Sequence, residues 1–530
     1  MNKVSREEAK KVSAEESSKT TKQNVQAGMS GQESKEPAEK AAGQSKVKSA
    51  GHERTLRMGT QSVPRLLLEF AIPSIAGMLI NSAYNVISAI FLGQAMGATG
   101  LAVTTAAFPL TMLFMALAML VGNGGNALAA LRLGQGMHGE AERVLGNTFS
   151  MAVVLSVLLA VFATIPPCME LLLSISSTTA DIHDLTRNYV WILSVGVIFQ
   201  IIGMGINNFI RTAGAPNRAL ATMVIGAVSC IFFSWLFVIV LGWGVEGSAL
   251  ATVVGQAISC VSVLWYFLMT SGVPMKLRRS CLVLKASLVK EILALGLASF
   301  CIQMAACVCN LLVNYQLVRF GSVSAVGAEN ALAAIGVVNR CAGLSFMPII
   351  GVATAAQPLI GYNYGAGLIA RVRQTLGYAI LYASLVGLVM WAIVHIWPSE
   401  IVMVFGVSPE YLDLTVFALQ VQMLLIPLIG VQVIVSNYFQ STGQPVKSIV
   451  LSLTRQVIYL IPSLLLLPVV IPLLLPVDSL YSLFMAWPTA DALAVVTSAI
   501  FLAFELRRLG RLERGEITDR YVKQGNGQGA

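Results

Sequence analysis

The chain has 530 residues, of which 56% are hydrophobic and only 12% are charged. About a quarter of the residues of an average soluble domain are charged, so this composition excludes a soluble globular protein. The formal net charge of +9 does not indicate a nucleic-acid partner, because the basic residues gather in alternate loops between apolar stretches and in the two tails. We therefore predict a protein that crosses a lipid bilayer many times.

Residues 1–62 precede the first long apolar stretch and are rich in Lys, Glu, Ser, Gln and Ala. A segment with so few apolar groups cannot offset the entropy that it loses on ordering, so we predict a disordered tail. The segment has no early apolar core and is therefore not a signal peptide. Residues 509–530 are predicted to form a second polar tail.

The apolar blocks between the tails are about 20 residues long or longer, which suits membrane-spanning α-helices and exceeds the length of membrane β-strands. Glycine and proline residues mark the joints between them. We predict an all-α protein with 12 transmembrane helices. The predicted spans are residues 66–92, 99–131, 143–166, 185–212, 217–241, 246–270, 288–318, 326–360, 373–397, 411–440, 447–475 and 480–505.

The loop charges predict the orientation in the membrane. An even number of spans places both tails on one side. Acidic residues dominate the loops on the opposite side, where Arg187 and Arg319 are minor exceptions. The positive-inside rule makes the basic side cytoplasmic, so we expect both termini in the cytoplasm. The basic loop residues on that side are Arg132, Arg143, Arg211, Arg218, Lys276, Arg278, Arg279, Lys285, Arg371, Arg373 and Lys447.

An internal repeat is the strongest organisational signal. Residues 208–218 align without gaps with residues 437–447, and Asn, Gly, Pro and a final basic residue coincide. Gly-x-Pro is also a common helix joint, but the loops at 133–136 (LGQG) and 364–367 (YGAG) repeat at nearly the same spacing. Because six spans separate the copies, the two halves have the same orientation. This predicts a pseudo-two-fold axis along the membrane normal and a substrate route between the halves.

We place the N-lobe at residues 63–275 and the C-lobe at residues 276–508. The residues that we assign to the repeat motifs and to a hinge between the lobes are Gly214, Pro216, Gln357, Pro358, Gly443 and Pro445.

Motifs for enzymatic chemistry, cofactors and metals are absent from the sequence. Residues 134–139 match GxGxxG, but they follow an apolar helix and lack the strand–turn–helix setting of a dinucleotide site. No Walker A motif is present, so an ion gradient is the expected energy source. The four histidines and eight cysteines show no metal-ligand spacing, and most of the cysteines lie in apolar blocks as small hydrophobic residues. We expect no enzyme activity, cofactor or metal.

Charged residues at membrane depth are costly and usually functional. Asp491 is the best candidate for a group that binds the coupling ion, and a structural carboxylate beside Pro488 is an equally good interpretation. Arg340 and Arg455 are the deepest arginines, and each could pair with Asp491 or bind an anionic group. Asn339 lies beside Arg340 in an otherwise apolar helix.

Two polar helix faces are further candidates for the lining of a cavity, although packing between helices explains such faces equally well. Both faces follow helical spacing and occur in the first span and in the seventh, which are counterparts in the repeat. Their residues are Asn81, Tyr84, Asn85 and Ser88 in the first span, and Gln303, Asn310 and Asn314 in the seventh.

These residues and motifs resemble the multidrug and toxic compound extrusion (MATE) family, and its DinF-like branch in particular. The resemblance covers residues 64–508, and its most specific parts are residues 331–335, 357–367, 211–216 and 440–445. It implies two six-helix lobes around a central cleft that opens to either side in turn. It also implies export of small amphipathic, often cationic compounds across the cell membrane, driven by protons or sodium ions. We expect a monomer in the lipid bilayer.

One departure from the family pattern concerns the N-lobe cation site. Where relatives carry acidic or amide groups, this chain has the uncharged residues Ser88, Cys230 and Ser234. The resemblance therefore does not identify the coupling ion. Our hypothesis is that coupling has moved to Asp491 with Arg340 or Arg455, or that this member is weakly coupled.

Two other functions compete with drug export. A flippase for lipid-linked sugars or oligosaccharides would need several basic residues in its cavity to meet a pyrophosphate, and the two deep arginines and 12 spans disfavour it. An intramembrane enzyme or receptor would need a catalytic pair or a large folded domain outside the membrane, and the sequence has neither.

Overall fold

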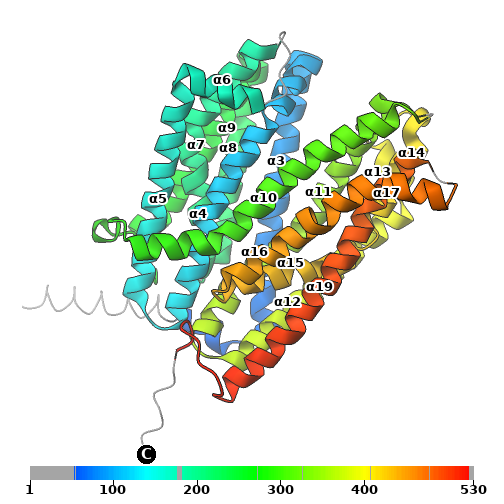
Figure 1. Cartoon of the computed structure of the whole chain (residues 1–530). Helices are drawn as coiled ribbons and strands as arrows, with labels where there is room; N and C mark the ends of the chain where they lie inside the picture. The colour runs from blue at the N-terminus through cyan, green and yellow to red at the C-terminus, as the bar shows by residue number, and fades with distance from the viewer. Residues whose placement is uncertain are drawn as a thin grey trace, which may run out of the picture. The chain divides into compact units, whose positions relative to one another are not determined.

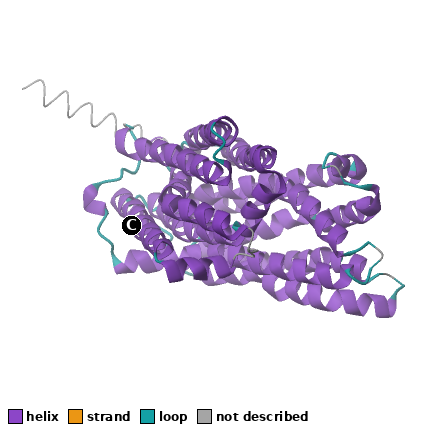
Figure 2. Cartoon of the chain, turned by 90° about the horizontal axis from the view of Figure 1, so that it is seen from above, coloured by secondary structure: helices purple, strands orange, loops and turns teal. Residues whose placement is uncertain are grey.

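The computed structural model describes residues 53, 55–175, 182–270, 272–324, 326–405, 407–476 and 478–523. The regular structure among these residues is entirely helical (Figure 2). The predicted disordered tail lies outside the described residues up to position 52. The helices of both lobes belong to one compact unit.

The N-lobe begins with α3 and ends with α9 (Figure 1). Its helices are α3 (Val63–Ala106), α4 (Phe108–Gly134), α5 (His138–Thr164), α6 (Pro166–Ile175), α7 (His183–Thr212), α8 (Pro216–Ser234), the π-helix η2 (Trp235–Val240) and α9 (Gly244–Met269). A short 3-10 helix, η3 (Arg279–Cys281), follows in the connection to the C-lobe.

The C-lobe contains the remaining helices. They are α10 (Ala286–Gly321), α11 (Ala328–Gly365), α12 (Ile369–Ile396), α13 (Pro398–Met403), α14 (Pro409–Met423), α15 (Ile426–Ser441), α16 (Pro445–Leu453), the π-helix η4 (Thr454–Leu460), α17 (Ile461–Leu474), α18 (Ser479–Phe484) and α19 (Ala486–Glu513). Eleven helical segments of the described chain are long and apolar enough to cross a membrane, and the bent pair α14 and α15 makes up to 12. The prediction of an all-α fold with about 12 spans is confirmed.

Two predicted boundaries need correction. Residues 99–106 were assigned to the second span, but they continue α3 beyond a break at Gly97, where φ is 59° and ψ is −140°. The second helix starts only at Phe108, because Pro109 fixes a helix N-terminus. The tenth span, predicted as one helix over 411–440, bends by 45° between α14 and α15. Pro427 lies in the first turn of α15, where it cannot donate a backbone hydrogen bond to α14.

The repeat motifs form equivalent joints. Gly214 and Gly443 have φ values of 79° and 76°, a conformation that glycine adopts without steric cost. The backbone N–H of the next residue donates to the carbonyl of Ile210 in the first joint and of Phe439 in the second. Pro216 and Pro445 then start α8 and α16. These residues therefore set the angle between successive helices in both lobes.

The lobes meet where α4 crosses α11. A Cβ atom on Gly134 would overlap the carbonyl oxygen of Tyr362, and a Cβ atom on Gly365 would overlap that of Leu131. Both Gly134 and Gly365, and likewise Leu131 and Tyr362, are 231 residues apart. The two contacts are therefore equivalent: each is formed by the repeat counterparts of the residues in the other. A two-fold axis through the crossing requires this relation.

The pairs α10·α4 and α3·α11 also join the lobes. Gly296 of α10 lies against the backbone of Leu120 in α4, and Gly351 of α11 lies against the backbone of Ile75 in α3. Leu120 and Gly351 are again 231 residues apart. Glycine permits this close approach of helix backbones, which is the usual way in which membrane helices pack.

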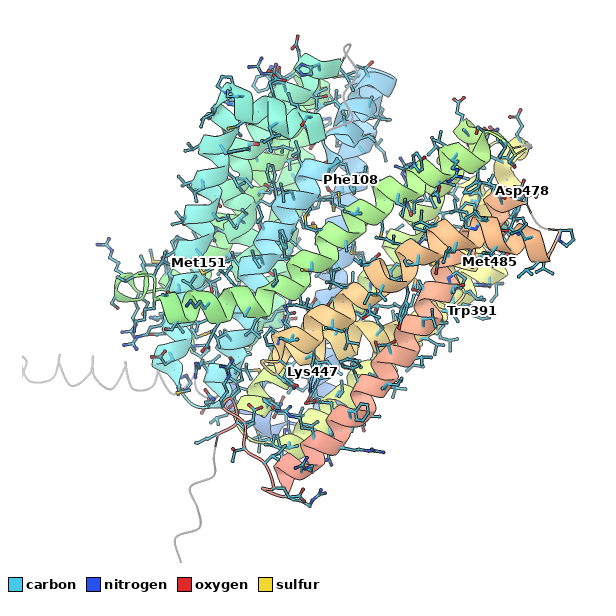
Figure 3. The ribbon with its side chains drawn as sticks, in the orientation of Figure 1. Phe108, Met151, Trp391, Lys447, Asp478 and Met485 are labelled. Atoms are coloured by element: carbon cyan, nitrogen blue, oxygen red, sulfur yellow. The ribbon has the colours of Figure 1, made fainter. Side chains whose placement is uncertain are left out.

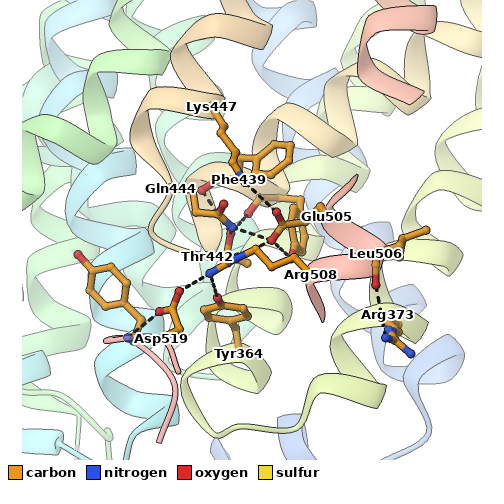
Figure 4. Close-up of polar contacts among 12 residues, drawn as sticks. Tyr364, Arg373, Phe439, Thr442, Gln444, Lys447, Glu505, Leu506, Arg508 and Asp519 are labelled. Carbon is orange, nitrogen blue, oxygen red and sulfur yellow. Dashed lines mark hydrogen bonds and ion pairs between the residues drawn. The ribbon is translucent and has the colours of Figure 1, made fainter. Parts of the chain in front are cut away.

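A buried carboxylate organises the C-lobe at the end that carries the basic loops, which we call the basic end (Figure 4). Glu505 is 1% exposed. It accepts hydrogen bonds from the Tyr438 hydroxyl (3.2 Å), the Gln444 amide (2.8 Å), the Lys447 ammonium (2.9 Å) and the Arg508 guanidinium (2.6 Å). These donors come from α15, the joint before α16, α16 and α19, so one carboxylate connects the region of α15 and α16 to the last helix of the lobe.

Residues 515–523 follow α19 and run across the basic end as a strap. Asp519 pairs with Arg508, and the Lys523 N–H donates to the Gly365 carbonyl at 3.0 Å. The Gln135 amide of the N-lobe donates to the Arg520 carbonyl at 3.4 Å. Tyr521 is buried against Gly443, and burial raises the pKa of its phenol. The strap, which falls within the segment predicted as a polar tail, thus contacts both lobes.

The last residues of the predicted N-terminal tail are also ordered at the basic end. Residues 55–60 are helical, and Met58 is buried. The Met58 carbonyl accepts hydrogen bonds from Asn363 (3.1 Å) and Arg371 (3.2 Å), both of the C-lobe. The described helical structure therefore begins several residues before position 62.

The crossing of α4 and α11 predicts a large difference between two glycine substitutions. Gly365→Ala forces the two helix backbones apart and is expected to destabilise the protein by about 1–3 kcal/mol or more. Gly377→Ala, in α12, meets no atom within 4 Å and is expected to be neutral or stabilising by about 0.5–1 kcal/mol. Thermal unfolding of the purified protein measures both, and a Gly365→Ala variant as stable as Gly377→Ala would contradict the crossing.

Candidate transport pathway between the lobes

One face of α10 runs from a covered part to an exposed part. Gly296 lies against α4. Gln303, about two turns further along, donates its amide to the Met112 sulfur of α4 at 3.7 Å. Asn310 and Asn314 follow about four and five turns beyond Gly296 on the same face, and both are exposed. The N-lobe therefore covers this face near the basic end and leaves it open further away.

The corresponding face of α11 also runs from a part that the N-lobe covers to an exposed part. Gly351 and Gly365, which face α3 and α4, lie 11 and 25 residues beyond Arg340. These spacings are about three and seven helical turns, so Arg340 points toward the N-lobe as well. Arg340 and its neighbour Asn339 are nonetheless exposed.

A row of methionines on α4 leads away from the basic end toward this exposed part. Met119, Met115 and Met112 lie about two, three and four turns before Asn126, which faces the C-lobe. All three are partly exposed. Methionine is flexible and polarisable and adapts to ligands of many shapes. Because Met112 contacts Gln303, the exposed polar residues of α10 and α11 lie beyond the methionines, away from the basic end; we call this part of the lobe interface the open region.

The basic end of this region is closed by amide hydrogen bonds between the lobes. The Asn126 amide donates to Gln357 at 3.1 Å, and the Gln357 amide donates to Gln440 at 3.4 Å. A second bridge runs from Asn123 of α4 to the Ser299 hydroxyl of α10 at 3.0 Å. We call these five residues the amide lock. Asn126 and Gln357 are 231 residues apart, so this bond joins two equivalent positions at the pseudo-two-fold axis.

Arg211 supports the lock from within the N-lobe. Its guanidinium is 2% exposed and donates to Asn207 (3.1 Å) and Asn208 (2.5 Å). The Asn208 amide donates in turn to Asn123 at 3.0 Å. Arg211 lies in the last turn of α7, where the helix dipole favours a positive charge. Its role here is to orient the amides of the lock.

In the N-lobe, the three uncharged residues at the usual cation-site positions do come together. The Ser88 hydroxyl lies 3.3 Å from the Ser234 hydroxyl and 3.9 Å from the Cys230 sulfur. Ser234 directly precedes the π-helix η2, and such segments occur frequently at functional sites. The site geometry is therefore retained, but without a carboxylate.

In the C-lobe, Asp491 is 1% exposed and pairs with Arg455, whose Nε donates to the carboxylate at 2.6 Å. The second carboxylate oxygen of Asp491 has no hydrogen-bond partner among the described residues. Arg455 lies in the π-helix η4, and its guanidinium is 5.6 Å from the centre of the Phe346 ring. Of the two arginines considered from the sequence, the structure thus pairs Arg455 with Asp491.

The remaining predicted site residues have separate environments. Asn85 is exposed and donates to the carbonyl of Asn81 at 2.7 Å, within its own helix. Tyr84 is one turn from Ser88 on the same face of α3 and is partly exposed. Arg340 forms no ion pair with a described residue. The structure therefore divides the predicted set among the N-lobe cluster, the C-lobe pair and the open region.

Sequence reasoning missed most of the amide lock and the Glu505 cluster. Asn126 carries the signal that could have revealed the lock, because it precedes the LGQG loop by the same distance as Gln357 precedes the YGAG loop. Aligning the repeats over whole helices would have paired these two residues. Glu505 and Arg508 show only the spacing of an ordinary surface pair, so nothing local indicates the burial of Glu505.

Comparisons with known proteins agree with this architecture. The MatE family model matches residues 73–236 and 302–465, once in each lobe. The multidrug export protein MepA of Staphylococcus haemolyticus (strain JCSC1435) is 22% identical over 86% of this chain and 97% of its own length.

Two solved structures are similar along most of the chain. The structure of the MATE multidrug transporter DinF-BH in complex with R6G has a TM-score of 0.75 and 32% identity, covering 84% of this chain and 96% of its own. An outward-facing conformation of a multidrug resistance MATE family transporter has a TM-score of 0.79 and 21% identity, covering 86% and 98%. With the family model matched in both lobes, the chain belongs to the MATE family of membrane transporters.

Proposed function

We propose that the protein is a secondary antiporter that exports small amphipathic molecules across the cell membrane by alternating access. The observation that carries this proposal is the contrast between the two ends of the lobe interface. The amide lock and the glycine crossing close the basic end, whereas Asn310, Asn314, Asn339 and Arg340 are exposed toward the opposite end. In Figure 3, Lys447 lies at the basic end and Phe108 at the start of α4.

The positive-inside rule makes the basic end cytoplasmic, so the described conformation is taken to be outward-open, with both termini in the cytoplasm. The drug-export names of MepA and DinF-BH support export as the direction. Inward opening would separate α4 from α11 and break the lock. Rigid lobes that rock about such an interface are typical of transporters built from parallel repeats.

Energy coupling requires a group whose ion occupancy differs between the two open states, because a ligand shifts an equilibrium only through differential affinity. Asp491 is the group that we assign to this role, since it is a carboxylate deep within a span and has one oxygen without a partner. Binding of a proton or a sodium ion there would weaken the pair with Arg455. The coupling ion is therefore H+ or Na+, and the uncharged Ser88 cluster takes no part.

The variant Asp491→Asn tests the coupling. We expect gradient-driven transport in proteoliposomes to fall at least tenfold, while substrate exchange without a gradient continues. The reason is that the substrate still crosses the membrane, but its movement is no longer coupled to the binding of an ion. Glu410→Gln is the matched control and should change neither activity, because Glu410 is an exposed carboxylate in the first turn of α14. Imposing either a pH gradient or a sodium gradient identifies the ion.

Asp491→Asn also leaves the partly exposed Arg455 without its counter-charge, which is destabilising by less than the value of about 3–5 kcal/mol for a fully buried pair. The double variant Asp491→Asn/Arg455→Gln separates the two effects because it removes both charges. Recovery of gradient-driven transport in the double variant would assign Asp491 a structural role and contradict the proposal.

The amide lock gives a second test. Gln357→Leu removes the bonds to Asn126 and Gln440 and leaves buried amides unpaired, at a cost of about 1–3 kcal/mol to the closed basic end. We expect the inward-open population to rise several-fold. Spin labels at Gly139→Cys and Ala370→Cys, in a background without the eight native cysteines, report the separation of the lobes.

Thr354→Val is the control for the lock, because Thr354 lies one turn away on α11 and bonds only to the carbonyl of Ile350 in its own helix. An unchanged distance distribution in Gln357→Leu would show that the amide bridges do not hold the basic end closed.

A further inference from the structure

The fixed charges within the spans are few and unbalanced. Among the described membrane spans, three Asp, Glu, Lys or Arg residues lie ten or more residues from both ends of their span, namely Arg340, Arg455 and Asp491. Asp491 and Arg455 are bound to each other at 2.6 Å. The charge that remains is the positive charge of Arg340.

Arg340 faces the open region between the lobes. It shares a helix face with Gly351 and Gly365, which touch the N-lobe, yet its own side chain is exposed. No carboxylate of the described residues lies within ion-pair distance of it. A charge at membrane depth is costly and requires water or a counter-charge, so Arg340 has a strong electrostatic preference for an anion that enters this region.

The surroundings of Arg340 favour an amphipathic anion over a small inorganic one. Asn339 is exposed beside it, and the exposed Asn310 and Asn314 of α10 lie on the face that continues from the contact with α4. On the side nearer the basic end, the partly exposed Met112, Met115 and Met119 of α4 offer an apolar surface. A planar guanidinium binds carboxylate, sulfonate or phosphate oxygens in pairs, while the methionines pack against an apolar body.

We infer that the transported substrates are amphipathic molecules with a single anionic group, and that Arg340 is the residue that binds this group. The inference rests on the proposed export function and replaces the expectation of cationic substrates that came from the family resemblance. The uncharged Ser88, Cys230 and Ser234 agree with it, because this cluster has no carboxylate to attract a cation. Arg340 is thus a residue that determines specificity.

Binding of two probes with one fluorophore and opposite permanent charges tests the inference. The probes are the dansyl amide of taurine, which carries a sulfonate, and the dansyl amide of 2-aminoethyl-trimethylammonium. Energy transfer from the tryptophans of the protein in phosphatidylcholine nanodiscs measures affinity. We expect the sulfonate to bind at least tenfold more tightly, because a hydrogen bond between two charged groups is stronger than one between neutral groups.

Variants then test the role of Arg340. Arg340→Gln is expected to weaken sulfonate binding about tenfold and to leave trimethylammonium binding unchanged, and Arg340→Lys should retain most of the affinity for the sulfonate. Arg319→Gln, an exposed arginine near the end of α10, is the matched control and should have no effect. Equal affinity for the two probes, or an Arg340→Gln variant that binds the sulfonate as wild type does, would overturn the inference.

Two further experiments identify the source of the anion and test the proposed export function separately from binding. Phosphatidylglycerol in the nanodisc should compete with the sulfonate if the natural anion is a lipid headgroup, and should not compete if the anion is a soluble compound. Gradient-driven uptake of the sulfonate into inside-out vesicles tests export itself. Selective binding through Arg340 without uptake would support the binding site and contradict the antiporter.

Discussion

The crossing of α4 and α11, backbone against backbone, is the contact on which the rest of the structure depends. Gly134 and Gly365 occupy equivalent positions in the repeat and each lies against a carbonyl of the opposite helix. Only glycine allows this distance. Because the crossing lies at one end of the helices, it brings the lobes together there and leaves their faces free further along. The position of two glycines therefore decides at which end the pathway is open.

The polar groups along this interface differ in the hydrogen-bond partners that are available to them. Near the crossing, where water has no access, the amides of Asn126, Gln357 and Gln440 bond to one another. Beyond the closed end, Asn310, Asn314, Asn339 and Arg340 are exposed and have no such partners among the residues that the structure describes. Buried polar groups must be paired, whereas exposed groups are solvated or meet a ligand. The same residue types are thus paired with one another at one end and exposed at the other, where we propose that they bind substrate.

The two lobes have diverged in charge while keeping the same architecture. Both carry a π-helical segment in the helix that follows the Gly-x-Pro joint, next to Ser234 in one lobe and containing Arg455 in the other. The N-lobe holds three uncharged groups beside this segment, and the C-lobe holds the pair of Arg455 and Asp491. The proposed ion-binding role of Asp491 and the inferred preference for anions both rest on this asymmetry, because the N-lobe cluster has no carboxylate to attract a cation.

The sequence alone determined the class of protein, the repeat and the joints. Apolar blocks, loop charges and the paired Gly-x-Pro motifs are local or periodic signals, and the all-α fold of about 12 spans and the matching of the family in both halves agree with them. It also singled out Asp491, Arg340 and Arg455, because charges in apolar helices are visible without a structure.

Only the tertiary structure decided which of these groups meet. Arg340 and Arg455 were equivalent partners for Asp491 in the sequence, and the structure pairs Asp491 with Arg455 and leaves Arg340 exposed. The burial of Glu505 likewise arises from packing between helices that are distant in the sequence. The physical reason is that periodicity fixes the face on which a residue lies, whereas its partner depends on which helix covers that face.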